Sequence, residues 1–195
     1  MLTVNQYREF FVEYLKKFPK NREPSNLYDP VSYILTLKGK RLRPILTLMA
    51  TDIFSDSYKP GLDAALAVEV FHNFSLVHDD IMDSAELRRG NVTVHKKWNV
   101  STGILSGDVM LIQAYQLFEN YEGEVFVDLA KLFSKTAIEV CEGQQYDVDF
   151  ETRDDVKIAD YLKMITYKTA VLLGASMKMG AIIARASKDE QNKIY

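Results

Sequence analysis

Apolar residues recur every three or four positions along most of this chain, which is the spacing of one face of an α-helix. The pattern is clearest over residues 61–83. The apolar face there consists of Leu62, Leu66, Val70, Phe74 and Val77. The same periodicity predicts further helices over 4–18, 29–37, 44–54, 102–121, 124–150 and 156–186. No strand-length alternation and no internal repeat is visible, so the sequence predicts an all-α helix bundle.

Helix boundaries are indicated by proline and by short polar residues. Asp29-Pro30 and Arg43-Pro44 each predict a helix start, because proline is favoured in the first turn. A polar segment, SAELRRGNVT, follows residue 83 and is predicted to be a loop. Thr152 to Asp155 reads as an N-cap followed by acidic residues in a first turn.

Composition limits the class of protein. The chain has 195 residues, 47% of them hydrophobic, which predicts one domain over 1–195 with a substantial core. The net charge of −3 gives no general attraction to nucleic acid. The single cysteine, Cys141, excludes an intramolecular disulfide and favours a reducing compartment. The longest apolar stretch, 170–184, is too short to span a bilayer and contains Lys178. We therefore expect a cytoplasmic protein without a membrane span.

The most informative segment is HDDIMD, because it places three carboxylates within about one helical turn. Asp79 and Asp83 are four residues apart and share a helix face, and Asp80 lies beside them. Negative charge at a helix C-terminus opposes the helix dipole, so a solvated surface is a poor explanation. Oxygen ligands of this kind suit Mg²⁺, which is usually held by one or two carboxylates together with substrate phosphates. Arg88 and Arg89 follow at once, and guanidinium groups match phosphate oxygens.

A second basic cluster, GKRLRP, opens a helix at 39–44. Basic side chains at a helix start form an anion site, although a solvated loop is an equally good explanation when the segment is taken alone. His72 lies two turns before Asp79 on the same face. With Glu69 it also forms the Glu-x-x-His spacing of di-iron bundles. Those proteins need that motif twice, and neither His78 nor His95 repeats it, so a di-iron centre is disfavoured.

Three weaker signals occur later in the chain. Gln144 and Asp147 are three apart on one helix face, and Lys168-Thr169 lies among apolar neighbours that favour an inward-facing lysine. A second acidic cluster contains Asp154, Asp155 and Asp160. The helix dipole explains these carboxylates at a helix start, so we assign them no metal.

The order GKRLRP, FHNFSLVHDDIMD, RRG, GQQYD and KT resembles the trans-polyprenyl diphosphate synthases, the farnesyl and geranylgeranyl diphosphate synthase family. The resemblance extends from about residue 39 to residue 169. It implies an antiparallel isoprenoid-synthase bundle around a substrate cavity, a homodimer, and condensation of isopentenyl diphosphate with an allylic diphosphate. It also implies two or three Mg²⁺ ions and no nucleic-acid partner.

The resemblance also assigns roles to individual residues. Asp79 and Asp83 would bind Mg²⁺ with Asp80 in support, and Asp147 would approach a metal. The remaining assignments follow the two diphosphates. Isopentenyl diphosphate would contact Lys40, Arg43, His72 and Arg89. The allylic diphosphate would contact Arg88, Gln144, Lys168 and Thr169. The residues expected to be catalytic are Asp79, Asp80, Asp83, Arg88 and Lys168.

The sequence departs from the family pattern in one respect. The family carries a second aspartate-rich motif, and after Lys168 this chain has only Asp189-Glu190. We therefore expect a C-terminally incomplete chain that lacks full catalytic competence, with one of its Mg²⁺ ions dependent on the second motif.

Product length is expected to depend on residues upstream of Asp79, where the growing tail would run. Phe74 is five residues upstream, Ser75 four and Phe71 eight. An aromatic at the fifth position resembles the short-chain enzymes and predicts a farnesyl or geranylgeranyl product, although Phe74 as a plain core residue is nearly as good an explanation.

Two other functions stay open on the sequence. A class I terpene cyclase shares the helical fold and an aspartate motif, but it has no need of the second basic site at Lys40, Arg43, His72 and Arg89. A non-catalytic prenyl synthase-like subunit is compatible with the absent second motif.

Overall fold

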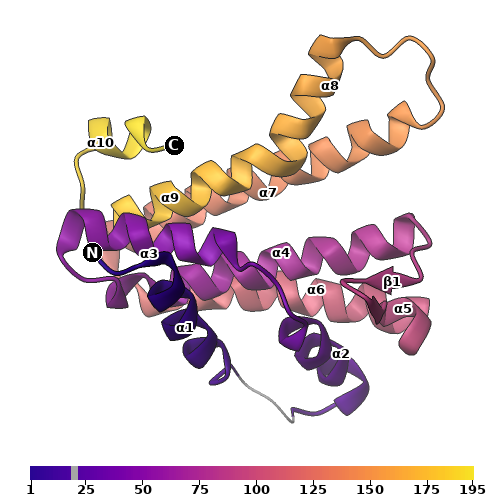
Figure 1. The fold of residues 1–195 in the computed structure, drawn as a ribbon, viewed down its shortest axis with the longest axis horizontal. Coiled ribbons are helices and arrows are strands. Elements are labelled where there is room, and N and C mark those ends of the chain that lie inside the picture. Colours follow the sequence, from indigo (N-terminus) through magenta and orange to yellow (C-terminus); the bar gives the residue numbers. More distant parts are fainter. Residues whose placement is uncertain (19–21) are drawn as a thin grey trace.

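The computed structural model describes residues 1–18 and 22–195 of the chain (Figure 1). Helices dominate it, as the periodicity predicts. In chain order the main helices are α1 (Val4–Leu15), α2 (Ser25–Thr36), α3 (Leu42–Ser55), α4 (Leu62–Met82), α6 (Val100–Gln116), α7 (Gly123–Phe150), α8 (Ile158–Ile165) and α9 (Val171–Ile183). The shorter ones are η1 (Lys59–Gly61), α5 (Val94–Lys97), η2 (Leu117–Asn120), η3 (Thr166–Ala170) and α10 (Lys188–Lys193). The predicted all-α class is confirmed.

Two predicted helix starts are wrong. Helix α2 begins at Ser25, so Pro30 lies inside the helix, where its ring is buried against the core. Helix α8 begins at Ile158, so Thr152 is not its N-cap; the first-turn carboxylate is Asp160, which accepts a hydrogen bond from the Lys157 backbone N–H at 3.2 Å. Arg43-Pro44 lies in the first turn of α3, as expected, because first-turn amide groups have no partner within the helix.

The segment after α4 differs from the predicted loop. Leu87–Arg88 (β1) and Asn91–Val92 (β2) form an antiparallel hairpin, with Arg89 and Gly90 both at positive φ in its turn. Two-residue strands are too short to give a visible alternation in the sequence. The hairpin fixes where Arg88 and Arg89 leave the backbone.

The helices pack in pairs, with α3 along α9 and α4 along α6 (Figure 1). The first pair approaches closely because Gly180 has no side chain; a Cβ there would lie 2.4 Å from the Thr47 carbonyl oxygen. Helix α4 contacts the other main helices on several sides, and most of its residues from Ala64 to Phe74 are buried. Its C-terminal end carries HDDIMD.

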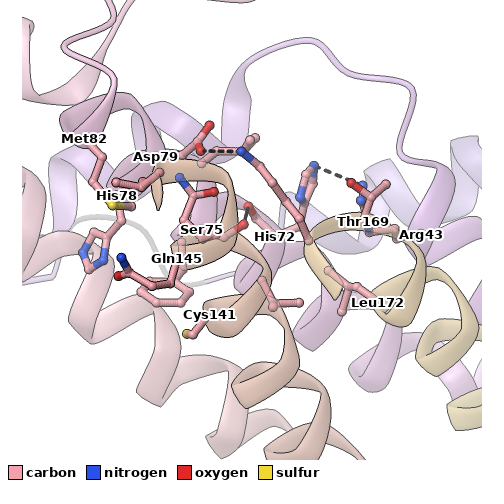
Figure 2. A pocket seen from close by; sticks show the side chains of 16 residues that line it. Arg43, His72, Ser75, His78, Asp79, Met82, Cys141, Gln145, Thr169 and Leu172 are labelled. Carbon is pink, nitrogen blue, oxygen red and sulfur yellow. Dashed lines mark hydrogen bonds and ion pairs between the residues drawn. The ribbon is translucent and has the colours of Figure 1, made fainter. Parts of the chain in front are cut away.

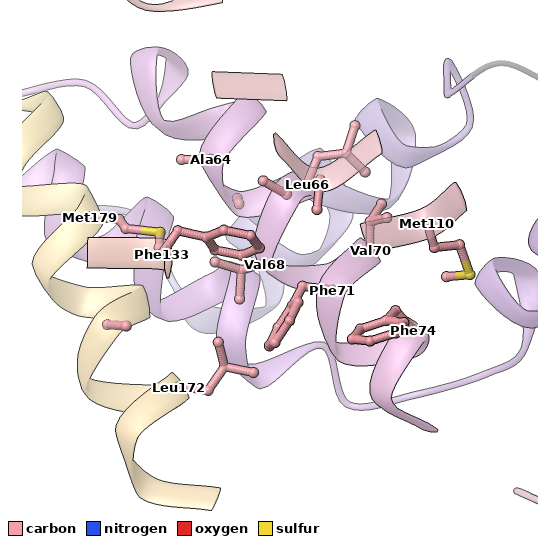
Figure 3. Close-up of a cluster of buried hydrophobic side chains, with 14 of the residues drawn as sticks. Ala64, Leu66, Val68, Val70, Phe71, Phe74, Met110, Phe133, Leu172 and Met179 are labelled. Atoms are coloured by element: carbon pink, nitrogen blue, oxygen red, sulfur yellow. The ribbon is translucent and has the colours of Figure 1, made fainter. Parts of the chain in front are cut away.

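An aromatic cluster around Phe133 of α7 fills the core (Figure 3). The Phe71, Tyr115 and Phe118 rings each contact it edge to face, with centroids 5.0, 4.7 and 5.1 Å away. Fully burying one such side chain contributes about 1.5–3 kcal/mol. This cluster therefore fixes α4, α6, η2 and α7 relative to one another.

Helices long and apolar enough to cross a membrane are absent from the described part of the chain.

Candidate active site

Of the three aspartates at the end of α4, one is buried and two are accessible. The Asp80 side chain is 1% exposed and that of Asp79 is 17% exposed, while Asp83 caps the helix and is exposed. Burial raises the pKa of Asp80, and Arg88 partly offsets this. Burial and the nearby Asp79 likewise raise the pKa of Asp83. The two accessible carboxylates are the pair that helical spacing predicted to point the same way.

Arg88 of β1 holds this end of α4. Its Nε and Nη2 donate to Asp80 Oδ1 at 2.9 and 2.5 Å, and Nη2 also donates to Asp79 Oδ2 at 3.2 Å. Burial lowers the pKa of Arg88, but the two carboxylates outweigh it and the net shift is upward. A guanidinium held in this way is fixed in position beside the accessible carboxylates.

Lys168 connects this cluster to α7. Its ammonium lies 2.5 Å from Asp147 Oδ2 and 3.5 Å from Asp79 Oδ1, so it bridges two carboxylates from different helices. The net shift of its pKa is upward, because these carboxylates outweigh the effect of burial. The predicted inward-facing lysine and the predicted shared face of Gln144 and Asp147 are both present.

The backbone around Lys168 is unusual. Thr166–Ala170 (η3) is a π-helical turn between α8 and α9, a feature that is often found at functional sites. It lies directly on Gly143 of α7; a Cβ there would be 2.2 Å from the Lys168 backbone nitrogen. Gly143 therefore permits the close approach that brings Lys168 to Asp147.

A second cationic group surrounds His72, which lies about two turns before Asp79 on α4. Arg43 Nη1 is 3.4 Å from His72 Nε2. The Arg89 guanidinium rests on Gly39, and the neighbouring Lys40 is exposed. Burial, followed by Arg43 and Arg89, lowers the pKa of His72 to about 3. Burial and neighbouring arginines also lower the pKa of Arg43 and of Arg89. Cations crowded in this way attract a polyanion.

A cavity of about 340 Å³ joins the two groups (Figure 2). Its polar lining includes Arg43, His72, Asp79, Gln144, Lys168 and Thr169. The rest is mainly apolar, and its lining includes Phe74, Ser75, Met82, Val140, Cys141 and Leu172. This cavity can hold a molecule with an anionic head and an apolar tail.

Phe71 does not line the cavity. It is fully buried behind Phe74, with ring centroids 5.5 Å apart, and it packs on Phe133. Sequence reasoning also did not find His78, which lines the cavity and stacks edge-on against Phe74 at 4.8 Å. The signal available was its position, one residue before Asp79.

The residues present suit Mg²⁺ in their chemistry. Among residues 1–18 and 22–195, no group of three or more His, Cys, Asp or Glu side chains forms a metal cage. Asp79, Asp83 and Asp147 are instead oxygen donors close enough to influence one another's ionisation, as the raised pKa of Asp83 reflects. An incomplete carboxylate set completed by substrate phosphates is the usual way in which Mg²⁺ binds. Glu69 is buried against Arg41 and is not a metal ligand, which removes the basis for a di-iron site.

The fold and the site define a class: a helical protein with two cationic groups beside an apolar cavity, which we call poles. One pole is formed by Arg88 and Lys168 and carries carboxylates for a divalent cation. The other, the basic pole, is formed by Lys40, Arg43 and Arg89 around His72. Residues 24–195 match the family described as Polyprenyl synthetase. The chain belongs to this family, as its motifs had indicated.

Individual relatives agree. A geranylgeranyl pyrophosphate synthase from Geoglobus acetivorans is 39% identical over 180 residues, covering 91% of this chain and 56% of that protein. A geranylgeranyl diphosphate synthase from Methanosarcina mazei is 41% identical over 168 residues, covering 85% and 52%. A crystal structure of a geranylgeranyl pyrophosphate synthase superimposes with a TM-score of 0.98 at 59% identity, covering 100% of this chain and 60% of that one. The chain thus spans a little over half the length of the curated relatives.

The depressed pKa of His72 predicts a pH dependence of stability. As pH falls below the ordinary value of 6.5, the unfolded chain protonates this imidazole, whereas the folded protein does so only near pH 3. Its contribution to the free energy of unfolding is therefore lost as pH falls. We expect the difference between wild type and His72→Gln to decrease by about 1.4 kcal/mol per pH unit below pH 6.5. Urea unfolding of both proteins at pH 7.0, 6.0 and 5.5 measures this, and a constant difference would contradict it.

Proposed function

We propose that the protein is a short-chain trans-prenyltransferase. It condenses isopentenyl diphosphate head-to-tail with an allylic diphosphate, in a Mg²⁺-dependent reaction, and gives farnesyl or geranylgeranyl diphosphate. The observation that carries this proposal is the presence of two distinct cationic poles on one apolar cavity. The reaction has two diphosphate substrates, and each pole suits one of them.

The pole at the end of α4 suits the allylic diphosphate. Arg88 and Lys168 carry positive charge there, each already in contact with Asp79. Gln144 and Thr169 line the same part of the cavity and offer uncharged hydrogen-bonding groups. Asp79 and Asp83, with Asp147, would hold Mg²⁺. When bound, Mg²⁺ would neutralise the negative charge that builds on a departing diphosphate.

The pole at Arg43 suits isopentenyl diphosphate. Arg43, Arg89 and the exposed Lys40 supply positive charge, and His72 is neutral at physiological pH because its pKa is about 3. A neutral imidazole donates a hydrogen bond to a phosphate oxygen from one ring nitrogen only. This pole is thus formed mainly by arginine and lysine, which suits a diphosphate that is bound but not cleaved.

The reaction that these poles support begins with ionisation. The allylic C–O bond breaks, and its electron pair leaves with the diphosphate oxygen. The double bond of isopentenyl diphosphate then supplies the electrons of the new C–C bond. A proton is lost from the adjacent carbon to the released diphosphate, and a new allylic double bond forms. The apolar walls, which include Phe74 and Leu172, exclude water from the carbocation.

The second basic pole also decides between this function and the alternatives. A terpene cyclase acts on one diphosphate and has no use for Arg43 and His72 in the lining of the same cavity, or for the charge of Arg89 near His72. A non-catalytic subunit has no need for Lys168 and Arg88 to be held beside accessible carboxylates. The cyclase therefore leaves the basic pole without a function, and the non-catalytic subunit leaves the pole at Arg88 and Lys168 without one.

Chain elongation tests the proposal directly. The protein expressed from its complete gene is incubated with Mg²⁺, isopentenyl diphosphate and dimethylallyl diphosphate, and products are resolved by carbon number. We expect a fifteen- or twenty-carbon diphosphate. Asp79→Asn should reduce the rate by about 100-fold or more, because it removes a carboxylate that would hold the Mg²⁺ needed to neutralise the leaving group. The matched control is Asp154→Asn, an exposed aspartate far along the sequence that should have no effect. Folded wild-type protein that gives no elongation would refute the proposal.

Phe74 is proposed to set the product length. Its ring lines the cavity at the part enclosed by α4 and α7, ahead of the fully buried Phe71. Phe74→Ala should lengthen the product by at least one five-carbon unit, measured in the same assay. Phe71→Leu is the control, because Phe71 lies behind Phe74 and does not line the cavity. An unchanged product from Phe74→Ala would exclude this role, and Ser75 would then be the remaining candidate.

A homodimer is the proposed assembly. Helix α6 leaves a row of large apolar side chains exposed: Val100, Ile104, Leu105 and Ile112. Large apolar side chains exposed along one helix are typical of an interface. Sedimentation velocity should give twice the mass of one chain for the wild type and the monomer mass for Leu105→Glu. The control is Lys131→Glu on α7, which also introduces a glutamate at an exposed position and should leave the dimer intact. A monomeric wild type at micromolar concentration would contradict this proposal.

The cytoplasmic location and the number of Mg²⁺ ions stay predictions.

A further inference from the structure

Arg41 lies between two residues of the basic pole, yet it is only 8% exposed. It is the N-cap of α3, with a positive φ of 53°. Its Nη2 donates to the carbonyl oxygens of Leu35 and Leu37 at 2.9 and 2.6 Å, and its Nη1 donates to Glu69 Oε1. The guanidinium therefore makes three hydrogen bonds inside the protein, and Arg41 does not line the cavity.

The partner of Arg41 is equally buried. Glu69 of α4 is 1% exposed, and its Oε1 also accepts a hydrogen bond from Asn73 Nδ2 at 2.9 Å. Asn73, which is itself fully buried, donates to the Glu69 carbonyl as well, at 2.8 Å. Burying two charges costs free energy that is recovered only when both are paired and hydrogen-bonded. An ion pair in this setting has one favourable geometry.

Each partner of the ion pair lies close in sequence to residues of the basic pole. On α4, Glu69 precedes His72 by three residues, so the two side chains share a face. On the other segment, Arg41 directly follows Lys40 and precedes Arg43 by two residues, and Arg89 rests on Gly39. The backbone that carries Lys40 and Arg43 is thus attached to the helix that carries His72 by this buried pair, in addition to the contact between Arg43 Nη1 and His72 Nε2.

We propose that Arg41 and Glu69 are positioning residues for isopentenyl diphosphate. They make no contact with the ligand. Their buried ion pair fixes the segment 39–43 on α4, so that Lys40, Arg43, His72 and Arg89 converge. This inference rests on the proposed function for the identity of the ligand.

A binding experiment separates positioning from general stability. Isopentenyl diphosphate is titrated alone into the protein by calorimetry, and dimethylallyl diphosphate with Mg²⁺ is titrated separately. The double variant Arg41→Met/Glu69→Leu replaces the pair with apolar side chains of similar size, a change that often preserves stability. We expect a melting temperature near that of wild type, an isopentenyl diphosphate Kd raised about tenfold, or about 1.4 kcal/mol, and an unchanged Kd for the allylic ligand.

Glu69→Gln provides a second test that does not depend on the double variant folding. It keeps the shape and one acceptor for Arg41 but removes the charge. If Glu69 acted only through the electrostatic potential, removing its negative charge would tighten isopentenyl diphosphate binding. Positioning predicts weaker binding instead. Tyr7→Phe is the matched control, because it removes the buried hydrogen bond to Asp52, at 2.5 Å, away from the cavity. It should lower stability and leave both affinities unchanged.

Several results would overturn the inference. These are wild-type affinity in the double variant, tighter or equal binding in Glu69→Gln, equal weakening of both ligands, and a wild type that does not bind isopentenyl diphosphate. Binding is measured without turnover, so a wild type that binds but does not elongate would refute only the proposed function.

Discussion

Two buried carboxylates on α4 are the constraint on which the site depends. Glu69 and Asp80 are each 1% exposed, and each is paired with an arginine from another segment. A carboxylate in that environment is tolerated only when it is paired, so the arginines must come to it. Arg41 and Arg88 are the two that do. The loop before α3 and the hairpin after α4 are thereby attached to the same helix, eleven residues apart along it.

This arrangement uses arginines of two kinds. Those that meet buried carboxylates are held in place by them, and the pKa of Arg88 is raised by its partners. Those that are left without a carboxylate, Arg43 and Arg89, have lowered pKa values because burial and neighbouring cations disfavour their charge. A polyanionic ligand relieves that repulsion. The alternation of paired and unpaired arginines along two short motifs therefore leaves Arg43 and Arg89 as the cations for the diphosphate binding that we propose.

Much of this was predictable, and the failures have physical causes. Long helices such as α4 and α7 followed from periodicity, because their apolar faces cover many turns. The shared face of Asp79 and Asp83 followed from helical spacing alone. The roles of Arg41 and Glu69 did not, because a motif such as GKRLRP does not reveal which of its cations turns inward. The start of α2 was missed because burial of Pro30 outweighs its preference for a first turn, and the π-turn at Lys168 has no signature in the pattern of apolar residues.

That π-turn has a consequence for how this helix tolerates change. A π-turn accommodates one residue more than a regular helical turn, so α9 is rotated by about 100° relative to an uninterrupted continuation of α8. The rotation is what allows Lys168 and Thr169 to face the cavity while later residues of α9, such as Ala175 and Met179, face the core. The number of residues in this segment is therefore constrained as well as their identity. Removal of a single residue anywhere within Thr166–Ala170 would restore a regular helix and leave either the cavity face or the core face out of phase.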